Sequence, residues 1–265
     1  MPIHCDIPIR NLTKAEFDEI DKVVMKCAYA SQNALGRLCD ERVYENDLAL
    51  RLHVAGLAEV HTQVPVTITH RDFQKVCRFD LVANHALYEL KTASGFVGEH
   101  DAQIMHYAMM AAVNHGKLIN FRPESVKGRL RFNALSTADR HQTTFDTRRW
   151  QRLGPGCERL HDHVVGLIKD WGGYLDTRLY EEALVHFFGG ETHCVSRVPV
   201  IRDGHELGTH RVQFHEDGAI FIITAITREK ARHEAHLRRL IGYTRLKAIQ
   251  WINCNHSTLE LITLK

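Results

Sequence analysis

Asp80, Glu89 and Lys91 lie within two apolar runs of the segment RFDLVANHALYELK, residues 78–91. The runs flank a short polar break, which is the pattern of a β-hairpin. With Asn84 and His85 as the two-residue turn, the register places Asp80 directly opposite Glu89. Opposed residues project from one face with Cβ atoms about 4.5–5.5 Å apart, and Lys91 projects from that face too. The hairpin is therefore predicted to gather two carboxylates and an ammonium group.

Two opposed carboxylates repel each other unless a cation lies between them. A hard divalent ion such as Mg²⁺ or Mn²⁺, which prefers oxygen ligands, removes the conflict. A lysine beside such an ion can orient an attacking water and stabilise negative charge on a phosphate. The pattern predicts metal-assisted phosphodiester hydrolysis. The alternative is that Asp…Glu-x-Lys occurs by chance on a solvated strand face.

The arrangement of Asp80 with Glu89-Leu90-Lys91 resembles the PD-(D/E)XK nuclease superfamily. More narrowly, residues 20–125 resemble the proteins named for a GxxExxY motif, although the glycine of that motif falls on Leu38, with Gly36 nearby. The stretches that carry the resemblance are Glu41-Arg42-Val43-Tyr44, Gln63-Val64-Pro65-Val66, Arg78-Phe79-Asp80-Leu81-Val82, Glu89-Leu90-Lys91, and Asp101-Ala102-Gln103 followed by Tyr107.

The resemblance implies a role for each matching residue. Asp80, Glu89 and the backbone carbonyl of Leu90 would bind the Mg²⁺ or Mn²⁺ ion, and Lys91 would be the catalytic lysine. Glu41 would be a further ligand or the base for the attacking water. Gln103 and Tyr107, four residues apart on one helix face, would match a Q-x-x-x-Y element that lines some of these sites. Taken singly, Gln103 could be an ordinary exposed residue and Tyr107 a core aromatic.

An internal repeat organises the chain. RVYENDLAL at 42–50 resembles RLYEEALVH at 178–186, and QVPV at 63–66 resembles RVPV at 197–200. DLVANHALYELK at 80–91 matches QFHEDGAIFIIT at 213–224, and the matches of HDAQ with HEAH and of LIN with WIN keep the same spacing. We expect two copies of one α/β domain, at 11–130 and 156–265, joined by a polar linker at 131–155 that ends in Gly154-Pro155-Gly156.

Each copy is predicted to contain two helices, three strands, a helix and a strand. In the first copy, Thr13 and Glu16 form a capping box that opens a helix ending at Leu35-Gly36. A second helix is expected at about 40–55 with Val43, Leu48 and Leu50 facing inward. Strands follow at 63–68, 76–91 (the hairpin) and 117–121, with a helix at about 99–113. The expected fold is two tandem restriction-endonuclease-like α/β/α domains, each with a mixed sheet flanked by helices.

The second copy is expected to have lost the chemistry. At matching positions Asp80 becomes Gln213, Glu89 becomes Ile222 and Lys91 becomes Thr224. Glu41, Gln103 and Tyr107 become Thr177, His236 and Leu240. The second copy would pack against the first as an intramolecular pseudo-dimer or hold substrate. The basic stretch at 226–247 could follow a phosphate backbone, although a charged helix face is usually only solvated.

Composition sets broad limits. The net charge of +2 among 265 residues permits a nucleic-acid partner without diagnosing one. The seven cysteines form no C-x-x-C pair, which argues against a disulfide scaffold and a zinc ribbon and fits a reducing cytoplasm. His205, His210 and His215 are five residues apart and are not expected to form a zinc site together. No apolar signal core or membrane span is expected, and no phosphate-binding loop or serine-hydrolase elbow is found.

The sequence therefore predicts a cytoplasmic Mg²⁺- or Mn²⁺-dependent nuclease with one active and one degenerate domain, and it favours DNA over RNA as substrate. The main alternative is a non-catalytic nucleic-acid-binding or assembly module that has retained the nuclease scaffold. A third possibility is a component of a larger repair or defence complex. A homo-oligomer is compatible with either.

Overall fold

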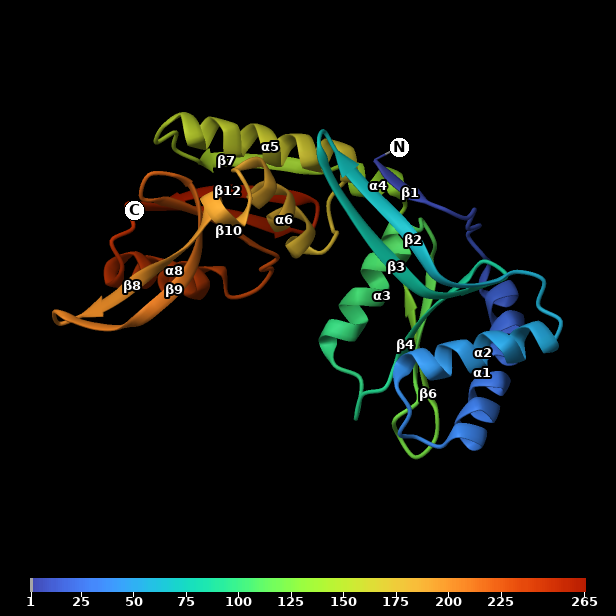
Figure 1. Ribbon diagram of the computed structural model, residues 1–265. Helices are drawn as coiled ribbons and strands as arrows, with labels where there is room; N and C mark the ends of the chain where they lie inside the picture. The colour runs from blue at the N-terminus through green and yellow to red at the C-terminus, as the bar shows by residue number, and fades with distance from the viewer. Residues whose placement is uncertain (1) are drawn as a thin grey trace. The chain divides into compact units, whose positions relative to one another are not determined.

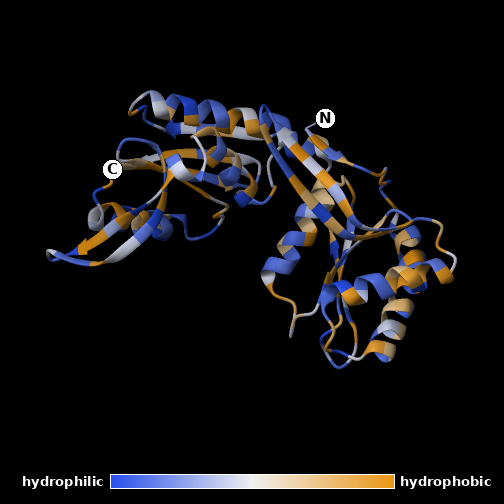
Figure 2. Cartoon of the chain, in the orientation of Figure 1, coloured by the Kyte–Doolittle hydropathy of each residue, from blue (hydrophilic) through white to orange (hydrophobic). Residues whose placement is uncertain are grey.

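The computed structural model describes residues 2–265, and the chain divides into two compact units, Met1–Thr137 (unit 1) and Ala138–Lys265 (unit 2). Each unit contains one sheet of six strands with helices on both faces (Figure 1). Hydrophobic and hydrophilic residues alternate along both the strands and the helices (Figure 2). Among the described residues, no helix is both long and apolar enough to cross a membrane.

Unit 1 is an α/β/α sandwich whose sheet follows the order β1-β2-β3-β4-β5-β6. Strands β4 and β5 pair in parallel, and all the other neighbours are antiparallel. Helices α1 and α2 cover one face, and α3 covers the other (Figure 1). The strands are β1 (Ile3–Cys5), β2 (Val60–His70), β3 (Phe73–Ala83), β4 (Ala86–Lys91), β5 (His115–Asn120) and β6 (Lys127–Phe132), and the helices are α1 (Lys14–Leu35), α2 (Glu41–Val54) and α3 (Gly98–Met110).

The first helix begins and ends where the sequence predicts. Thr13 and Glu16 form the reciprocal capping box, and Gly36, at φ +75°, closes the helix with its N–H donating to the Gln32 carbonyl. The second helix also matches its predicted span. The prediction of its inward residues was wrong in part, because Val43 and Leu50 are exposed while Leu48 is buried with Tyr44. Tyr44, Leu48 and Leu52, spaced four residues apart, form the buried stripe that anchors α2 in the core.

The predicted hairpin has the expected turn and register. Asn84 and His85 both have positive φ, as a two-residue type I′ turn requires. Ala83 lies opposite Ala86, and Leu81 lies opposite Tyr88. One further step along this register places Asp80 opposite Glu89, as predicted. The side chains of Leu81 and Tyr88 enter the core beneath α1 and α2, so the alternation along β4 directs Glu89 to the other face.

Unit 2 has the sheet order β7-β12-β11-β10-β9-β8. Helices α5 and α6 pack on one face, and α8 packs on the other (Figure 1). The strands are β7 (Thr144–Arg149), β8 (Val195–Arg202), β9 (His205–Glu216), β10 (Ala219–Thr224), β11 (Ala248–Asn255) and β12 (Thr258–Leu264), and the helices are α5 (Pro155–Trp171), α6 (Thr177–Phe187), α7 (Glu191–Cys194) and α8 (Lys230–Tyr243). Strands β8 to β12 therefore follow the order of β2 to β6, and β10 pairs in parallel with β11 as β4 does with β5.

A hydrogen bond between a tyrosine and a glycine recurs at matching positions of the two units. The Tyr44 hydroxyl donates to the Gly36 carbonyl at 2.7 Å, and the Tyr180 hydroxyl donates to the Gly172 carbonyl at 2.6 Å. Each bond ties the end of one helix to the start of the next. The shared order of elements therefore extends to individual contacts.

The side-chain amides of Asn120 and Asn253 provide the other recurring contact. Each amide bridges the backbone N–H and C=O of one residue beyond the neighbouring parallel strand, Ala93 in unit 1 and Ile226 in unit 2. The four positions fall at the spacing predicted for the repeat. The same polar anchor thus closes the end of the parallel strand pair in both sheets.

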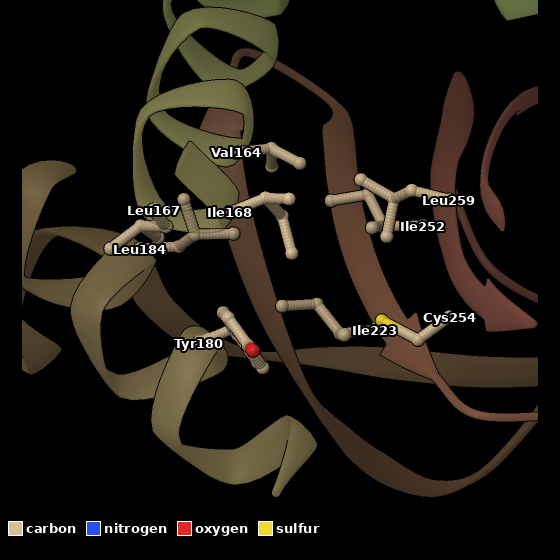
Figure 3. A pocket seen from close by; sticks show the side chains of 9 residues that line it. All are labelled: Val164, Leu167, Ile168, Tyr180, Leu184, Ile223, Ile252, Cys254 and Leu259. Atoms are coloured by element: carbon tan, nitrogen blue, oxygen red, sulfur yellow. The ribbon is translucent and has the colours of Figure 1, made fainter. Parts of the chain in front are cut away.

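An aromatic ring in the core of unit 1 is replaced by a smaller side chain in unit 2. In unit 1, Phe121 stacks on Tyr44 with ring centroids 4.5 Å apart and an interplanar angle of 10°. At the matching position unit 2 has Cys254, whose smaller side chain lines an apolar cavity together with Tyr180, α5 and α6 (Figure 3). The cavity lies where the ring would be.

Two predictions about the repeat need correction. The expected linker at 131–155 contains α4 (Thr137–His141) and β7, and β7 pairs in parallel with β12 at the edge of the second sheet. Its polar composition reflects an edge strand exposed on one side rather than a linker.

The second correction concerns the register of β9. A bulge sets Phe214 opposite Ile220 and Glu216 opposite Ala219, which leaves His215 as the extra residue. Gln213 consequently lies opposite Phe221, the counterpart of Tyr88. One further step places Val212, rather than Gln213, opposite Ile222. The counterpart of Asp80 by register is thus an apolar residue.

Candidate active site

Asp80 lies at the point where β3 and β4 separate. The backbone ladder between the strands ends at Leu81 and Tyr88, and the Asp80 carboxylate continues it by accepting the Leu90 N–H at 2.9 Å. On the other side of β3, the register with β2 places Gln63 opposite Asp80. The carboxylate is therefore held by a backbone donor of β4, the strand that pairs with its own.

Glu89 and Lys91 form a buried ion pair on β4. The Lys91 Nζ lies 2.6 Å from Glu89 Oε1, and the two side chains are 13% and 2% exposed. The other carboxylate oxygen, Glu89 Oε2, is buried and has no hydrogen-bond partner among the described residues. An unpaired buried carboxylate oxygen is costly, which makes it an observation that calls for a ligand.

The protonation of this pair follows from its surroundings. Burial, and next the negative charge of Asp80, raise the pKa of Glu89 to about 8. Burial alone would lower the pKa of Lys91, but the carboxylates of Glu89, Glu41 and Asp80 outweigh it and raise that pKa. Lys91 therefore keeps its positive charge at neutral pH. Glu89 is largely protonated at that pH, and a cation beside it would favour its ionised form.

Glu41 is the first residue of α2 and lies within electrostatic reach of the hairpin. Burial raises the pKa of Glu41, and the negative charge of Asp80 adds to this rise. The positive charge of Lys91 and a hydrogen bond from the Thr92 backbone act in the opposite direction without cancelling it. Among the described residues, the carboxylates of Glu41, Asp80 and Glu89 do not form a group with all ligand atoms within 4.8 Å of one another. Glu41 thus stands near the pair without completing a tight cluster of three acids.

The structure adds two residues that the sequence analysis gave no role. Glu45, one turn after Glu41 on α2, is buried and accepts the Gln63 side-chain amide at 2.6 Å. The same amide lies 3.4 Å from Asp80 Oδ1. Gln63 has a φ of +52°, an uncommon conformation for a residue other than glycine and one often found at functional sites. The four-residue spacing from Glu41 was the signal that could have identified Glu45.

Gln103 and Tyr107 lie together on α3, as their spacing predicts. The Gln103 amide donates to the Tyr107 hydroxyl at 3.3 Å, and the Tyr107 ring packs against Phe79 with centroids 5.1 Å apart. Burial raises the pKa of Tyr107 to about 12, and the charges of Glu89 and Asp80 act in the same direction. The phenol is therefore a neutral hydrogen-bonding group beside the acids.

Leu90 takes part through its backbone. Its side chain is fully buried in the core beneath α1 and α2. Its N–H holds Asp80, so a single residue both anchors β4 and orients a carboxylate. The structure thus brings Asp80, Glu89, Leu90, Lys91, Glu41 and the Gln103–Tyr107 pair into one region of unit 1.

At matching positions of unit 2 the charged groups are replaced. Ile222 and Thr224 occupy β10 where Glu89 and Lys91 occupy β4, and Ile222 packs in the apolar cluster beneath α8. The Thr224 hydroxyl donates to Asn253 and accepts from the Trp251 indole N–H. These residues are part of the sheet packing.

Residues 18–132 match the family model of the PD-(D/E)XK nuclease superfamily. The matched range runs from the first turns of α1 to the end of β6 and contains every candidate site residue of unit 1. No curated protein and no solved structure matches the chain.

Proposed function

We propose that unit 1 is a divalent-metal-dependent nuclease that hydrolyses phosphodiester bonds, with DNA rather than RNA as its substrate. The observation that carries this proposal is the buried Glu89 Oε2 without a partner, beside Asp80 and paired through its other oxygen with Lys91. The superfamily match over residues 18–132 supports a nuclease, and a nucleic acid is its substrate class.

The donor set fits Mg²⁺ or Mn²⁺. Asp80, Glu89 and the Leu90 carbonyl offer oxygen atoms only, and hard divalent cations prefer such ligands. A bound ion would supply a Lewis acid that stabilises charge on the phosphate and lowers the pKa of water. It would also neutralise the repulsion that raises the pKa of Glu89.

The remaining residues act on the substrate or on the attacking water. Lys91, held charged by the surrounding carboxylates, stabilises the negative charge that develops on the phosphate. Glu41 accepts a proton from the water. Its raised pKa makes it a stronger base than an ordinary glutamate. Glu45 holds the Gln63 amide against Asp80 and so positions that ligand.

Gln103 and Tyr107 are proposed to line the same site from α3. Both are neutral and can donate hydrogen bonds to a phosphate oxygen without changing their protonation. The stretches around Glu41 and Tyr44 support the narrower assignment to the GxxExxY proteins.

Unit 2 is proposed to be a degenerate copy of the same domain. The recurring Tyr–Gly and Asn–backbone hydrogen bonds support a common origin, and Val212, Ile222 and Thr224 leave no acid or lysine at the matching positions. Its proposed contribution is packing or holding substrate. The basic stretch at 226–247 offers fewer free charges than its composition indicates, because Lys230, Arg232, Arg238 and Lys247 are ion-paired with acids of unit 2.

Calorimetric titration of the full chain with MnCl₂ tests this proposal against the non-catalytic alternative. We expect binding to unit 1, loss of that binding in Asp80→Asn, and no change in the matched unit 2 control Glu181→Gln. Absence of Mn²⁺ binding together with retained DNA affinity would instead support a binding module. Equal binding by Asp80→Asn and the wild type would place the ion elsewhere.

A further inference from the structure

Three potential metal ligands converge in unit 2, away from the positions that match the candidate active site. They are Cys157 in the first turn of α5, and His215 and Glu216 at the end of β9. One ligand atom from each lies within 4.8 Å of the others, and the Cys157 Sγ is 3.3 Å from Glu216 Oε1. Among the residues that the structure describes, this is the one group of three His, Cys, Asp or Glu side chains that is so close.

The buried, unpaired imidazole of His215 indicates a ligand at this cluster. Its side chain is 3% exposed, and neither Nδ1 nor Nε2 has a hydrogen-bond partner among the described residues. A buried imidazole ordinarily donates from one nitrogen and accepts at the other. The side chain thus offers two unpaired nitrogen atoms in a cluster that also contains a thiol and a carboxylate.

The β-bulge explains how adjacent residues reach one site. Successive residues of a regular strand point to opposite faces, so His215 and Glu216 would normally diverge. His215 is the extra residue of the bulge, and bulges of this kind redirect side chains. At the corresponding end of β3 the pairing with β4 is regular.

Two further groups hold the cluster from outside. The Gln250 side-chain amide donates to the Cys157 Sγ at 3.0 Å, and the Gly156 N–H donates to Glu216 Oε2 at 3.1 Å. Amide donors to a sulfur and a carboxylate fix ligands in the way that supporting residues do around known metal sites. Gly156 is required here, because a Cβ on it would lie 2.5 Å from the His215 carbonyl oxygen.

The matching positions of unit 1 show that the fold does not need these residues. By the spacing of the repeat, Cys157 and Gln250 correspond to Asp21 and Lys117, which form a salt bridge with an Nζ–Oδ2 distance of 2.5 Å. By register Glu216 corresponds to Ala83, which is buried in the sheet, and His215, the extra residue of the bulge, has no counterpart in unit 1. Unit 1 therefore has an ion pair and a buried alanine at the matching positions, and the ligand-type side chains are particular to unit 2.

We propose that Cys157, His215 and Glu216 bind one thiophilic divalent cation of the Zn²⁺ class. Thiolate, imidazole and carboxylate are the ligands that Zn²⁺ takes in proteins, and three of them leave one position of a tetrahedron for water or another ligand. Binding releases the thiol proton to solvent, and the thiolate keeps the Gln250 amide as its donor. The ion links the start of α5 to the end of β9. This inference does not depend on nuclease activity in unit 1.

Cobalt titration of the full chain tests the site, because Co²⁺ bound to a thiolate gives a charge-transfer absorption that an all-oxygen site cannot give. We expect one equivalent of Co²⁺ to produce the band and Zn²⁺ to remove it. Cys157→Ser should abolish the band, and His215→Val, which removes the imidazole, should raise the Co²⁺ Kd at least tenfold. Asp80→Asn and the matched control Cys194→Ser should retain the band.

Thermal unfolding provides the second readout. Zn²⁺ should raise the Tm of the wild type and of Asp80→Asn but not that of Cys157→Ser. If His215→Val does not fold, Glu216→Gln replaces it and should also weaken binding at least tenfold. The proposal is overturned if the wild type gives no charge-transfer band, or if Cys157→Ser retains it with unchanged affinity.

Discussion

At the scale of single residues, Glu89 is the carboxyl group at which pH and stability are linked to the proposed metal binding. Burial, with Asp80 beside it, raises its pKa in the folded chain from 4.5 to about 8. The folded protein therefore favours the protonated form. The stabilisation is fully present below the unfolded pKa and is lost as the pH rises through about 8. A residue that weakens the free protein at alkaline pH is typical of a functional site.

The first prediction follows from this loss of stability with rising pH. In a chelating buffer, the free energy of unfolding of unit 1 should fall as the pH rises from 6 to 9, and Glu89→Gln should remove most of that fall. We expect Glu89→Gln to be more stable than the wild type at pH 9 by roughly 1–3 kcal/mol. Urea unfolding at both pH values measures it. The exposed Glu19→Gln is the control, and a wild-type slope retained by Glu89→Gln would contradict the assignment.

The second prediction concerns the metal itself. Because the cation must displace the proton of Glu89, the Mn²⁺ affinity of the wild type should rise about tenfold per pH unit between pH 6 and 8 and then level off. Calorimetry in buffers of different ionisation enthalpy counts the protons released. We expect about one proton per Mn²⁺ at pH 7, and a value near zero would show that Glu89 is already ionised.

At the scale of the elements, local signals in the sequence predicted what local chemistry determines. The capping box of Thr13 and Glu16 fixed the start of α1, and the positive-φ turn at Asn84 and His85 fixed the hairpin register. Strand β7 was missed because its pairing partner, β12, lies more than a hundred residues further along the chain. Such an edge strand is polar and carries no periodic signal of its own.

In the candidate site too, the sequence predicted the features that depend on local spacing and missed those that depend on contacts between distant elements. The spacing of Asp80, Glu89 and Lys91 predicted their shared location, since a regular hairpin with its turn at Asn84 and His85 places Asp80 opposite Glu89. Glu45 and Gln63 were missed because their importance comes from a contact between α2 and β2, which depends on the packing of the two elements. The bulge at His215 was missed for a related reason, because the matching hairpins have the same length in sequence.

The third prediction tests the equivalence of the elements in the two units. Tyr44→Phe and Tyr180→Phe each remove the hydroxyl that donates to a glycine carbonyl, and neither changes the packing of the ring. Each variant should lose about 1–2 kcal/mol of unfolding free energy. Urea unfolding measures both. A loss in one variant only would mean that the two bonds do not play the same part in their units.

In the whole molecule, catalysis is proposed for unit 1 alone. Unit 2 lacks more than the two side chains on β10, because the bulge in β9 places Val212 where an acid would be needed. Replacing only Ile222 and Thr224 should therefore not create a second site.

The fourth prediction is that two substitutions on β10 do not give unit 2 an active site. In a Lys91→Ala background, adding Ile222→Glu and Thr224→Lys should leave nucleic-acid cleavage at the level of Lys91→Ala alone. The measurement is cleavage of labelled DNA with Mn²⁺, and circular dichroism confirms that the variant is folded. Recovery of cleavage would show that unit 2 retains a latent site.

The most direct measurement is cleavage of single-stranded, double-stranded and branched DNA and of RNA by the wild type and by Lys91→Ala, with Mn²⁺ or with a chelator. We expect Mn²⁺-dependent cleavage of at least one DNA substrate by the wild type. Lys91→Ala should lose about 100-fold or more of this activity, corresponding to roughly 3 kcal/mol of transition-state stabilisation. Equal cleavage by the two proteins, or no cleavage of any substrate by the wild type, would contradict it.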